Sequence, residues 1–509
     1  MAYLLGIDIG TTGTKTLLID DAGKVVAKAL AEYDLLIPRP NWAEQNPEDW
    51  WTATVATIHQ VLAASGVRPS AIAGIGLSGQ MHGSVFLDEA DRVIRPAILW
   101  CDQRTAEQCR WIHDAVGYDK VVAETLNPVL TGFQAPKIVW LRDNEPDAYA
   151  RVRKVLLPKD YVRLRLTGEY ATEVSDASGT ALLNVTERRW SKVMLDGIGL
   201  PESWFPEVYE SAVPSTKVSA SAAAETGLAE GTPVVGGGGD QAAGAVGNGI
   251  VETGVVSSTL GTSGVVFAHL DVPVMDEKLR TMTYCHAVPG KWHVMGVMLS
   301  AGGSVRWLRD VLCSDEKAVA AQMEVDPYML IDGEAWTVPP GAHGLLFLPY
   351  LTGERTPYPN PDAKGVFFGL SLMHEKRHMI RAVLEGVAFG MRDSFEIIKA
   401  MGVDFTQVRS SGGGGKSAIW RQIMADVTGD AHWTINVDEG PAFGVALLAG
   451  VGAGAWATVP EACKATIKPV ETIEPDPAKK ALYDKYYALY QDLYRRLEGA
   501  YTDLAAVID

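Results

Sequence analysis

A short glycine-rich pattern that occurs twice is the feature of this sequence that most limits its fold. Residues 9–15 read IGTTGTK, and residues 260–266 read LGTSGVV. Each copy lies between apolar runs that we expect to be strands, namely Tyr3–Ile9, Lys15–Ile19, Val255–Leu260 and Val265–Ala268. A pattern repeated about half a chain apart indicates a duplicated unit. We therefore predict two domains of related design, each with one glycine hairpin.

Strands and helices alternate along the rest of the chain, which indicates an α/β architecture. Val25–Leu30 would extend the first hairpin into a meander, and Ala71–Leu77 would add a further strand. Asn46 is a typical N-cap residue, and Pro47 suits the first position of a helix. We predict a C-terminal helix over residues 476–505. Its tyrosines recur at helical spacing, and we interpret them as one face that packs on the rest of the protein.

The two hairpins are candidates for phosphate binding. Glycine permits positive φ angles and leaves room for an anion beside the backbone. Exposed N–H groups and threonine hydroxyls can then donate hydrogen bonds to phosphate oxygens. One copy alone would favour an ordinary turn, but two copies, with Lys15 after the first, favour phosphate binding.

Two more glycine clusters predict contacts with a ligand. Thr232–Gly239 ends in four glycines and presents Asp240, which favours an acid held against a ligand over a solvated loop aspartate. Residues 410–417, SSGGGGKS, lie between an expected strand at Gln407–Ser410 and an expected helix at Ala418–Thr428. This cluster differs from the P-loop pattern at its first glycine, so we predict a nucleotide site without a Walker loop.

The segments GQMHG at 79–83 and ILWCDQR at 98–104 predict a site for a small polyol. Glutamine, histidine, aspartate and arginine can bond several hydroxyls, while a nearby tryptophan can cover an apolar face. A structural histidine is the alternative interpretation of His82, and the density of polar groups favours a ligand.

Two other pattern matches are interpreted as coincidences. Residues 74–79 fit GxGxxG, but no helix follows them, as a dinucleotide site would require. Residues 374–378 fit HExxH, but two cations lie inside the pattern and no third ligand is evident. We expect a charged helix start there instead of a zinc site.

Composition excludes further classes of protein. Acidic residues outnumber basic ones by 62 to 45, a net charge of −17, which argues against nucleic acid as a partner. The start of the chain lacks the basic segment of a signal peptide, and five scattered cysteines form no CxxC pair. The uncharged stretch 440–460 contains five glycines and two prolines, which favours a buried helix over a membrane span. We predict a cytoplasmic protein without membrane contact.

The chain resembles the FGGY carbohydrate kinase family, within the actin-like ATPase superfamily. The segments that carry the resemblance are 6–15, 79–83, 96–104, 135–146, 156–170, 236–247, 260–264, 348–361 and 365–386. The resemblance implies a two-domain actin-like (ribonuclease H-like) α/β fold with a central cleft. Residues 1–247 would hold the sugar site and the first phosphate hairpin, residues 248–475 the nucleotide site, and residues 476–509 the helical tail.

The resemblance also implies the activity: an ATP-dependent kinase that phosphorylates a ketose hydroxyl with Mg²⁺ as cofactor. Within the family, the segments are most similar to kinases that convert D-xylulose to its 5-phosphate. Asp240 matches the catalytic base, and Asp8 matches the acid that holds Mg²⁺ directly or through water. The candidate sugar-binding residues are Gln80, Met81, His82, Asp102, Asp240 and Gln241. The candidate nucleotide-binding residues are Thr11, Thr12, Gly13, Lys15, Gly261, Thr262, Gly302, Trp307, Gly413 and Ser417.

Alternatives within and outside the family stay open. Gln241 follows Asp240 where xylulose-specific members usually have asparagine, and a longer side chain could reshape the sugar site. A kinase of ribulose, tetrulose, gluconate or glycerol is therefore the first alternative. A non-catalytic sugar or nucleotide sensor is the second, and the acids at positions 8 and 240 weigh against it. A homodimer is common in the family.

Overall fold

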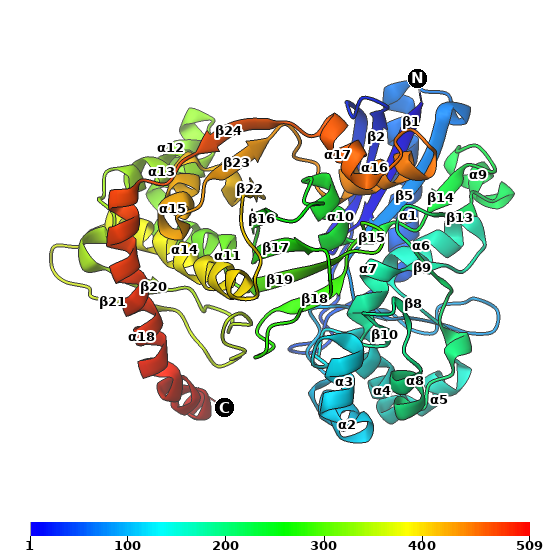
Figure 1. Cartoon of the computed structure of the whole chain (residues 1–509), viewed down its shortest axis with the longest axis horizontal. Helices are drawn as coiled ribbons and strands as arrows, with labels where there is room; N and C mark the ends of the chain where they lie inside the picture. Colours follow the sequence, from blue (N-terminus) through cyan, green and yellow to red (C-terminus); the bar gives the residue numbers. More distant parts are fainter. Residues whose placement is uncertain (1, 509) are drawn as a thin grey trace.

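Two seven-stranded sheets form the framework of the molecule (Figure 1). The computed structural model describes residues 2–508. The first sheet contains β13 (Pro214–Lys217), β14 (Pro233–Val235), β5 (Ile72–Gly79), β1 (Tyr3–Ile9), β2 (Gly13–Asp20) and β3 (Val25–Glu32) in that order, with β15 (Gly238–Gly239) also beside β5. The second contains β18 (Met282–Cys285), β19 (Trp292–Met298), β17 (Gly264–Leu270), β16 (Val255–Leu260), β22 (Gln407–Ser411), β23 (His432–Ile435) and β24 (Pro469–Ile473).

The two sheets repeat one plan. In the first, β1 pairs antiparallel with β2 and parallel with β5, and β2 continues to β3. In the second, β16 pairs antiparallel with β17 and parallel with β22, and β17 continues to β19. Each sheet ends in a further parallel strand, β14 or β23, that carries an antiparallel edge strand. The prediction of an α/β fold with two related halves is therefore confirmed.

Helix α16 (Pro441–Gly452) crosses back from the second half and packs on the first sheet (Figure 1). A Cβ atom on Gly6 would lie 1.9 Å from the Ala442 carbonyl oxygen, and one on Gly76 would lie 2.0 Å from the Val445 carbonyl oxygen. Only glycine therefore lets the helix approach these strands so closely. The GxGxxG match at 74–79 is thus a helix-packing surface, and α16 is the buried helix expected at 440–460.

Helix α16 also packs against α10 (Asp240–Gly247), the helix that begins at Asp240. A Cβ atom on Gly444 would lie 1.8 Å from the Ala243 carbonyl oxygen. The small residues after Asp240 therefore fix α10 against a helix from the other half of the chain. The division of the chain at residue 247 stays a prediction.

Several local predictions are confirmed. Helix α1 (Pro47–Ser65) begins after Asn46, whose side chain accepts a hydrogen bond from the Glu48 N–H at 3.3 Å. Helix α14 (Lys376–Ala400) begins directly after Glu375, as expected for a charged helix start. The tail forms α18 (Pro477–Ile508), and its buried tyrosines include Tyr483, Tyr490 and Tyr494.

The remaining elements surround the two sheets. Those of the first half are β4 (Glu44–Gln45), β6 (Val85–Leu87), β7 (Ala97–Ile98), α2 (Ala106–Val116), α3 (Tyr118–Thr125), α4 (Gln134–Asn144), α5 (Pro146–Arg151), β8 (Lys154–Leu156), α6 (Pro158–Thr167), β9 (Thr172–Glu173), α7 (Val174–Ala177), β10 (Leu183–Asn184), β11 (Arg189–Trp190), α8 (Lys192–Ile198), β12 (Val208–Tyr209) and α9 (Ala220–Thr226). Those of the second are α11 (Gly302–Leu312), α12 (Ser314–Met323), α13 (Pro327–Trp336), β20 (Leu346–Leu348), β21 (Val366–Phe368), α15 (Ala418–Thr428) and α17 (Val459–Thr466). Within residues 2–508, none of the helices is both long and apolar enough to cross a bilayer.

Candidate active site

Two carboxylates meet at one edge of the first sheet. Asp8 in β1 pairs with Ser78 of β5 across the parallel ladder, and Gly238 of β15 pairs with Ser78 from the other side. Asp240 follows β15 directly as the first residue of α10. Because these strands are parallel, their carboxyl ends bring Asp8 and Asp240 to the same edge, where ligands of open α/β sheets bind.

Both carboxylates hold their protons more tightly than carboxylates in water. Burial raises the pKa of Asp240 to about 7, and the nearby charge of Asp8 adds to this rise. Hydrogen bonds from the backbone and side chain of Gln241 oppose it. Burial also raises the pKa of Asp8 to about 6. A carboxylate that titrates near neutral pH suits a general base, and Asp240 is such a group.

Asp8 also fits the requirements of a magnesium ligand. Its Oδ1 atom is buried and accepts no hydrogen bond from the described residues. Burying an ionised oxygen without a partner is costly unless a cation or water covers it. Mg²⁺ is commonly held by one or two carboxylates together with substrate phosphates. Asp8 could therefore hold a magnesium ion that arrives with a nucleotide.

Gln80 supports the first glycine hairpin. Its amide oxygen accepts a hydrogen bond from the Thr11 hydroxyl at 3.2 Å, and its amide nitrogen donates to Gln45 at 2.9 Å. Gln45 donates to the Thr11 carbonyl at 2.7 Å, and the Trp100 indole donates to the Thr11 hydroxyl at 2.9 Å. Gln80 is 1% exposed, so its amide positions the hairpin and does not face a sugar. Nothing in the sequence around Gln45 marks it as a neighbour of Thr11.

Lys15 lies beside this hairpin but already has an anionic partner. Its ammonium forms an ion pair with Glu439, in the segment before α16, and Lys28 binds the same carboxylate at 2.7 Å. Thr12, at the tip of the hairpin, is exposed, whereas Gly13 is buried. A phosphate bound by Lys15 would therefore compete with Glu439.

Five of the predicted nucleotide-binding residues line one cavity of about 540 Å³ in the second half. They are Gly261, Thr262, Gly302, Gly413 and Ser417. The second glycine hairpin thus lies against the glycine cluster at 412–415, which comes from a different part of the sequence. A cavity of this size is within the range of small-molecule sites.

Trp307 is not among the residues that line this cavity. On α11, Gly302, Val305 and Arg306 face the cavity. The Trp307 ring points elsewhere and stacks on Phe347 with the ring centres 6.3 Å apart. Since successive helical residues are rotated by about 100°, one step along the helix moves a side chain to another face. The predicted nucleotide contact of Trp307 therefore does not agree with its position.

The cavity also contains polar residues that sequence analysis missed. Arg306 donates a hydrogen bond to the Thr262 hydroxyl at 3.0 Å. Burial raises the pKa of Asp332 on α13, and a hydrogen bond from Ser417 opposes this rise. Polar residues at helical spacing in a sequence indicate the exposed face of a helix. The pattern does not show which of them line a cavity together with residues from another segment.

Met81 and His82 lie close to the strand that presents Asp240. Met81 is 4% exposed, and a Cβ atom on Gly239 would come within 2.9 Å of its side chain. The Nδ1 atom of His82 lies 2.6 Å from the Gly179 carbonyl oxygen, which can only accept, so Nδ1 carries the proton. Burial lowers the pKa of His82 to about 3, which keeps the ring neutral and leaves Nε2 as a hydrogen-bond acceptor.

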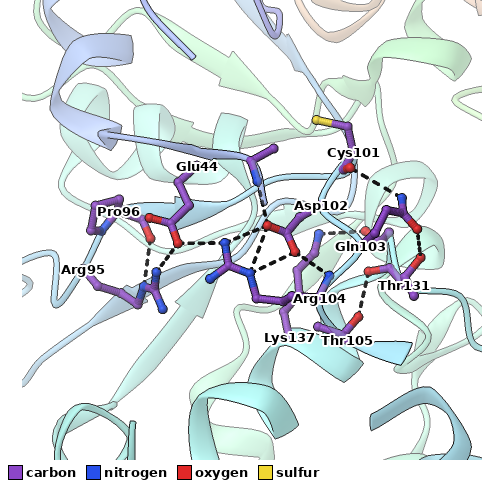
Figure 2. A network of polar contacts seen from close by, with 12 residues as sticks. Glu44, Arg95, Pro96, Cys101, Asp102, Gln103, Arg104, Thr105, Thr131 and Lys137 are labelled. Atoms are coloured by element: carbon purple, nitrogen blue, oxygen red, sulfur yellow. Dashed lines mark hydrogen bonds and ion pairs between the residues drawn. The ribbon is translucent and has the colours of Figure 1, made fainter. Parts of the chain in front are cut away.

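Asp102 lies in a closed network of polar contacts (Figure 2). Its carboxylate accepts hydrogen bonds from the Ala43 N–H at 2.7 Å and from the Arg104 guanidinium at 2.7 Å. Arg104 also pairs with Glu44 at 2.8 Å and lies 3.5 Å from the centre of the Trp42 ring. Asp102 is completely buried, so the protein itself engages its oxygens. The structure therefore gives Asp102 a structural role instead of the predicted contact with sugar.

Comparison with known proteins agrees with this arrangement. The models of the N-terminal and C-terminal domains of the FGGY family of carbohydrate kinases match residues 3–247 and 256–453. The chain is 39% identical over 502 residues to the xylulose kinase of Escherichia coli strain K12, covering 97% of this chain and 99% of that protein. It is 33% identical to the gluconokinase of Bacillus subtilis strain 168, covering 99% and 98%. The crystal structure of xylulose kinase from Rhodospirillum rubrum has a TM-score of 0.90 and 31% identity, covering 98% of this chain and 100% of that one. The chain belongs to the FGGY family of carbohydrate kinases.

Proposed function

We propose that this protein transfers the γ-phosphate of ATP to a ketose, and that its substrate is D-xylulose, which becomes D-xylulose 5-phosphate. The observation that carries the proposal is the position of Asp240, a half-buried residue whose pKa is raised to about 7, beside Asp8 at the glycine-lined end of β15. Similarity to xylulose kinases supports this choice of sugar.

In the proposed reaction, Asp240 accepts the proton of the attacking sugar hydroxyl. The hydroxyl oxygen bonds to the γ-phosphorus of ATP, the bond from that phosphorus to the bridging oxygen breaks, and ADP leaves. Met81 covers the sugar, and the free Nε2 of His82 accepts a hydrogen bond from another hydroxyl. The transition state of phosphoryl transfer is loose, so the protein mainly positions the reactants and stabilises spread charge. A magnesium ion held by Asp8 and the phosphates would supply part of that stabilisation.

The nucleotide would lie between the two halves, with its adenosine in the cavity lined by Gly302 and Gly413. Backbone N–H groups of the two hairpins would hold the phosphates from opposite sides. When ATP binds, the ion pair between Lys15 and Glu439 would break, and Lys15 would bind a phosphate instead. The predicted homodimer and cytoplasmic location remain part of the proposal, the latter because ATP is supplied there.

A screen of sugars by coupled ADP release tests the proposal. D-xylulose should raise the rate well above the sugar-free rate, and by more than D-ribulose, erythrulose, D-gluconate or glycerol. The second candidate is gluconate, because the chain is 33% identical to a gluconokinase. Faster turnover of D-gluconate than of D-xylulose would establish that alternative. Absence of ADP release with every sugar would contradict a kinase and favour a sensor.

A further inference from the structure

Arg355 is a cation that the proposed mechanism does not use. It lies in the long segment between β20 and β21, in the second half of the chain. Among the described residues, none accepts a hydrogen bond from its guanidinium, and no carboxylate lies within the 4.0 Å of an ion pair. The side chain is half-buried. An arginine buried to this extent normally has an anionic or carbonyl partner, because desolvating an unpaired charge is costly.

The neighbour Glu354 does not neutralise this charge. Burial raises the pKa of Glu354 to about 8, so its carboxyl group is mostly protonated at neutral pH. Its Oε1 atom accepts hydrogen bonds from the backbone N–H groups of Leu299 at 3.0 Å and Arg355 at 2.7 Å. Glu354 therefore fixes the backbone of Arg355 and leaves the guanidinium without a counter-ion.

Thr356, the residue after Arg355, also fixes the backbone at this point. The Thr356 N–H donates to the Val297 carbonyl at 3.1 Å, and the Thr356 hydroxyl accepts from the Val297 N–H at 3.1 Å. Val297 belongs to β19, beside β18 at the centre of the molecule (Figure 1). The residues on both sides of Arg355 are thus hydrogen-bonded to β19 or to Leu299 just after it, so the position of the Arg355 backbone is set before any ligand arrives.

The strands that hold the Arg355 segment pack on the part of the first half that contains His82. Val297 and Tyr284 share a buried cluster with Phe133, so the second sheet packs on the first half at this point. The Tyr284 ring lies 6.3 Å from the His82 ring and 6.2 Å from the Phe133 ring. Burial lowers the pKa of His82, and the positive charges of Lys137 and then of Arg355 lower it further. The segment that carries Arg355 therefore lies at the same junction of the two halves as His82.

The chemistry of this pair indicates the ligand. A guanidinium offers only donors, whereas the free Nε2 atom of His82 is an acceptor. A carbonyl oxygen beside a hydroxyl group satisfies both, and that is the keto end of a ketose. Two carboxylates, Asp8 and Asp240, at the edge of the first sheet and a net charge of −17 favour a neutral sugar over an anionic one.

We propose that Arg355 is a sugar-binding residue that donates hydrogen bonds to the keto oxygen of the substrate. The second half thereby completes a sugar site that the first half provides with Met81, His82 and Asp240. This inference rests on the proposed function, since it names the part of the ketose that the enzyme recognises.

The experiment compares two ligands that differ only at the carbonyl. Isothermal titration measures the dissociation constants of D-xylulose and xylitol for the full chain, for Arg355→Met, for Arg355→Lys and for a control, Arg280→Met. Arg280 is also an arginine near this segment, but its guanidinium is paired with Asp276 at 2.7 Å. Arg355→Met should weaken D-xylulose binding about 10- to 100-fold, the range for a hydrogen bond to a charged group, and leave xylitol binding nearly unchanged.

The outcomes separate this inference from the proposed function. Arg355→Lys should lose less affinity than Arg355→Met, and Arg280→Met should match the unsubstituted protein. D-xylulose binding to Arg355→Met that stays within about threefold of the original, or an equal loss for both ligands, would overturn the role of Arg355. Tight binding of D-gluconate that depends on Arg355 would show that it recognises a carboxylate instead. If the unsubstituted protein neither binds nor phosphorylates D-xylulose, the proposed function itself fails.

Discussion

The two glycine hairpins occupy the same place in two copies of one sheet, but they present different chemistry. In the first half, Asp8 pairs with Lys15 across the hairpin. In the second, Thr259 pairs with Val265, and the Thr259 hydroxyl lies 2.8 Å from that of Ser411. The first half thus has charges where the second has neutral groups. The duplicated frame fixes where the side chains stand, and the difference between the side chains is why we propose that the first half serves the reacting atoms and the second the nucleotide.

Substitution of Asp240, the proposed base in the first half, should have the largest effect on activity. Asp240→Asn keeps the shape of the side chain but cannot accept the proton, so kcat should fall by about 10²–10⁴-fold. Binding of ATP should hardly change, because the cavity that we propose for the nucleotide lies in the second half. Coupled ADP release and titration with ATP measure the two quantities. A kcat close to that of the unsubstituted protein would show that another group is the base.

The matched positions of the two hairpins allow a direct comparison. Asp8→Asn should lower activity by about 10- to 100-fold, as loss of a group that orients a metal does, and raise the Mg²⁺ concentration needed for half-maximal rate. Thr259→Val removes one neutral hydrogen bond to Ser411, worth about 1 kcal/mol, and should mainly lower the unfolding temperature. Kinetics at several Mg²⁺ concentrations and thermal unfolding test both. Equal losses of activity in the two variants would contradict the division of roles.

A substitution that introduces a steric clash in the second half should weaken nucleotide binding and leave sugar binding unchanged. A Cβ atom on Gly302 would lie 2.4 Å from the Gly261 carbonyl oxygen, so Gly302→Ala should displace the second hairpin. We expect KM for ATP to rise about tenfold, in line with the cost of overpacking, while KM for the sugar changes little. Gly499→Ala, in open space on α18, is the control. A comparable rise in the sugar KM would mean that the hairpin serves both ligands.

The smallest expected effect is a shift in the pH dependence of the activity, caused by the two carboxylates of the first half. Asp240 must be deprotonated to accept a proton, so kcat/KM should rise with pH through the pKa of Asp240, which burial and the charge of Asp8 raise to about 7. Asp8→Asn removes the charge of Asp8, so the acid limb of the profile should move to lower pH. Thr259→Val should leave that limb in place. A profile unaffected by Asp8→Asn would show that the two carboxylates do not interact.

Local patterns allowed much of the framework to be predicted. The repeated hairpins, the cap at Asn46 and the tail helix follow from apolar period, glycine placement and capping, which depend on neighbours within a few residues. The same kind of signal marked Asp240, because four glycines before an acid are unusual at a structural turn. Residues 261, 302 and 413 were also predicted, and one cavity contains all three.

The assignment of roles within the site depended on distant contacts. Gln80 and Asp102 look like sugar ligands in the sequence, but Thr11, Gln45 and Arg104 engage them in the structure. A polar side chain is free or occupied according to which residues fold next to it, and no local pattern records those neighbours.

Sequence by itself thus determined the duplicated α/β frame, the two glycine hairpins and the position of Asp240. Tertiary structure decided that Trp307 stacks on Phe347 and does not line the cavity beside Gly302, that α16 returns to the first sheet, and that the residues on both sides of Arg355 are hydrogen-bonded to Val297 and Leu299. The physical reason is the range of the interactions. Backbone hydrogen bonds and apolar period act along the chain, whereas burial, charge pairing and cavity shape arise only when distant segments pack together.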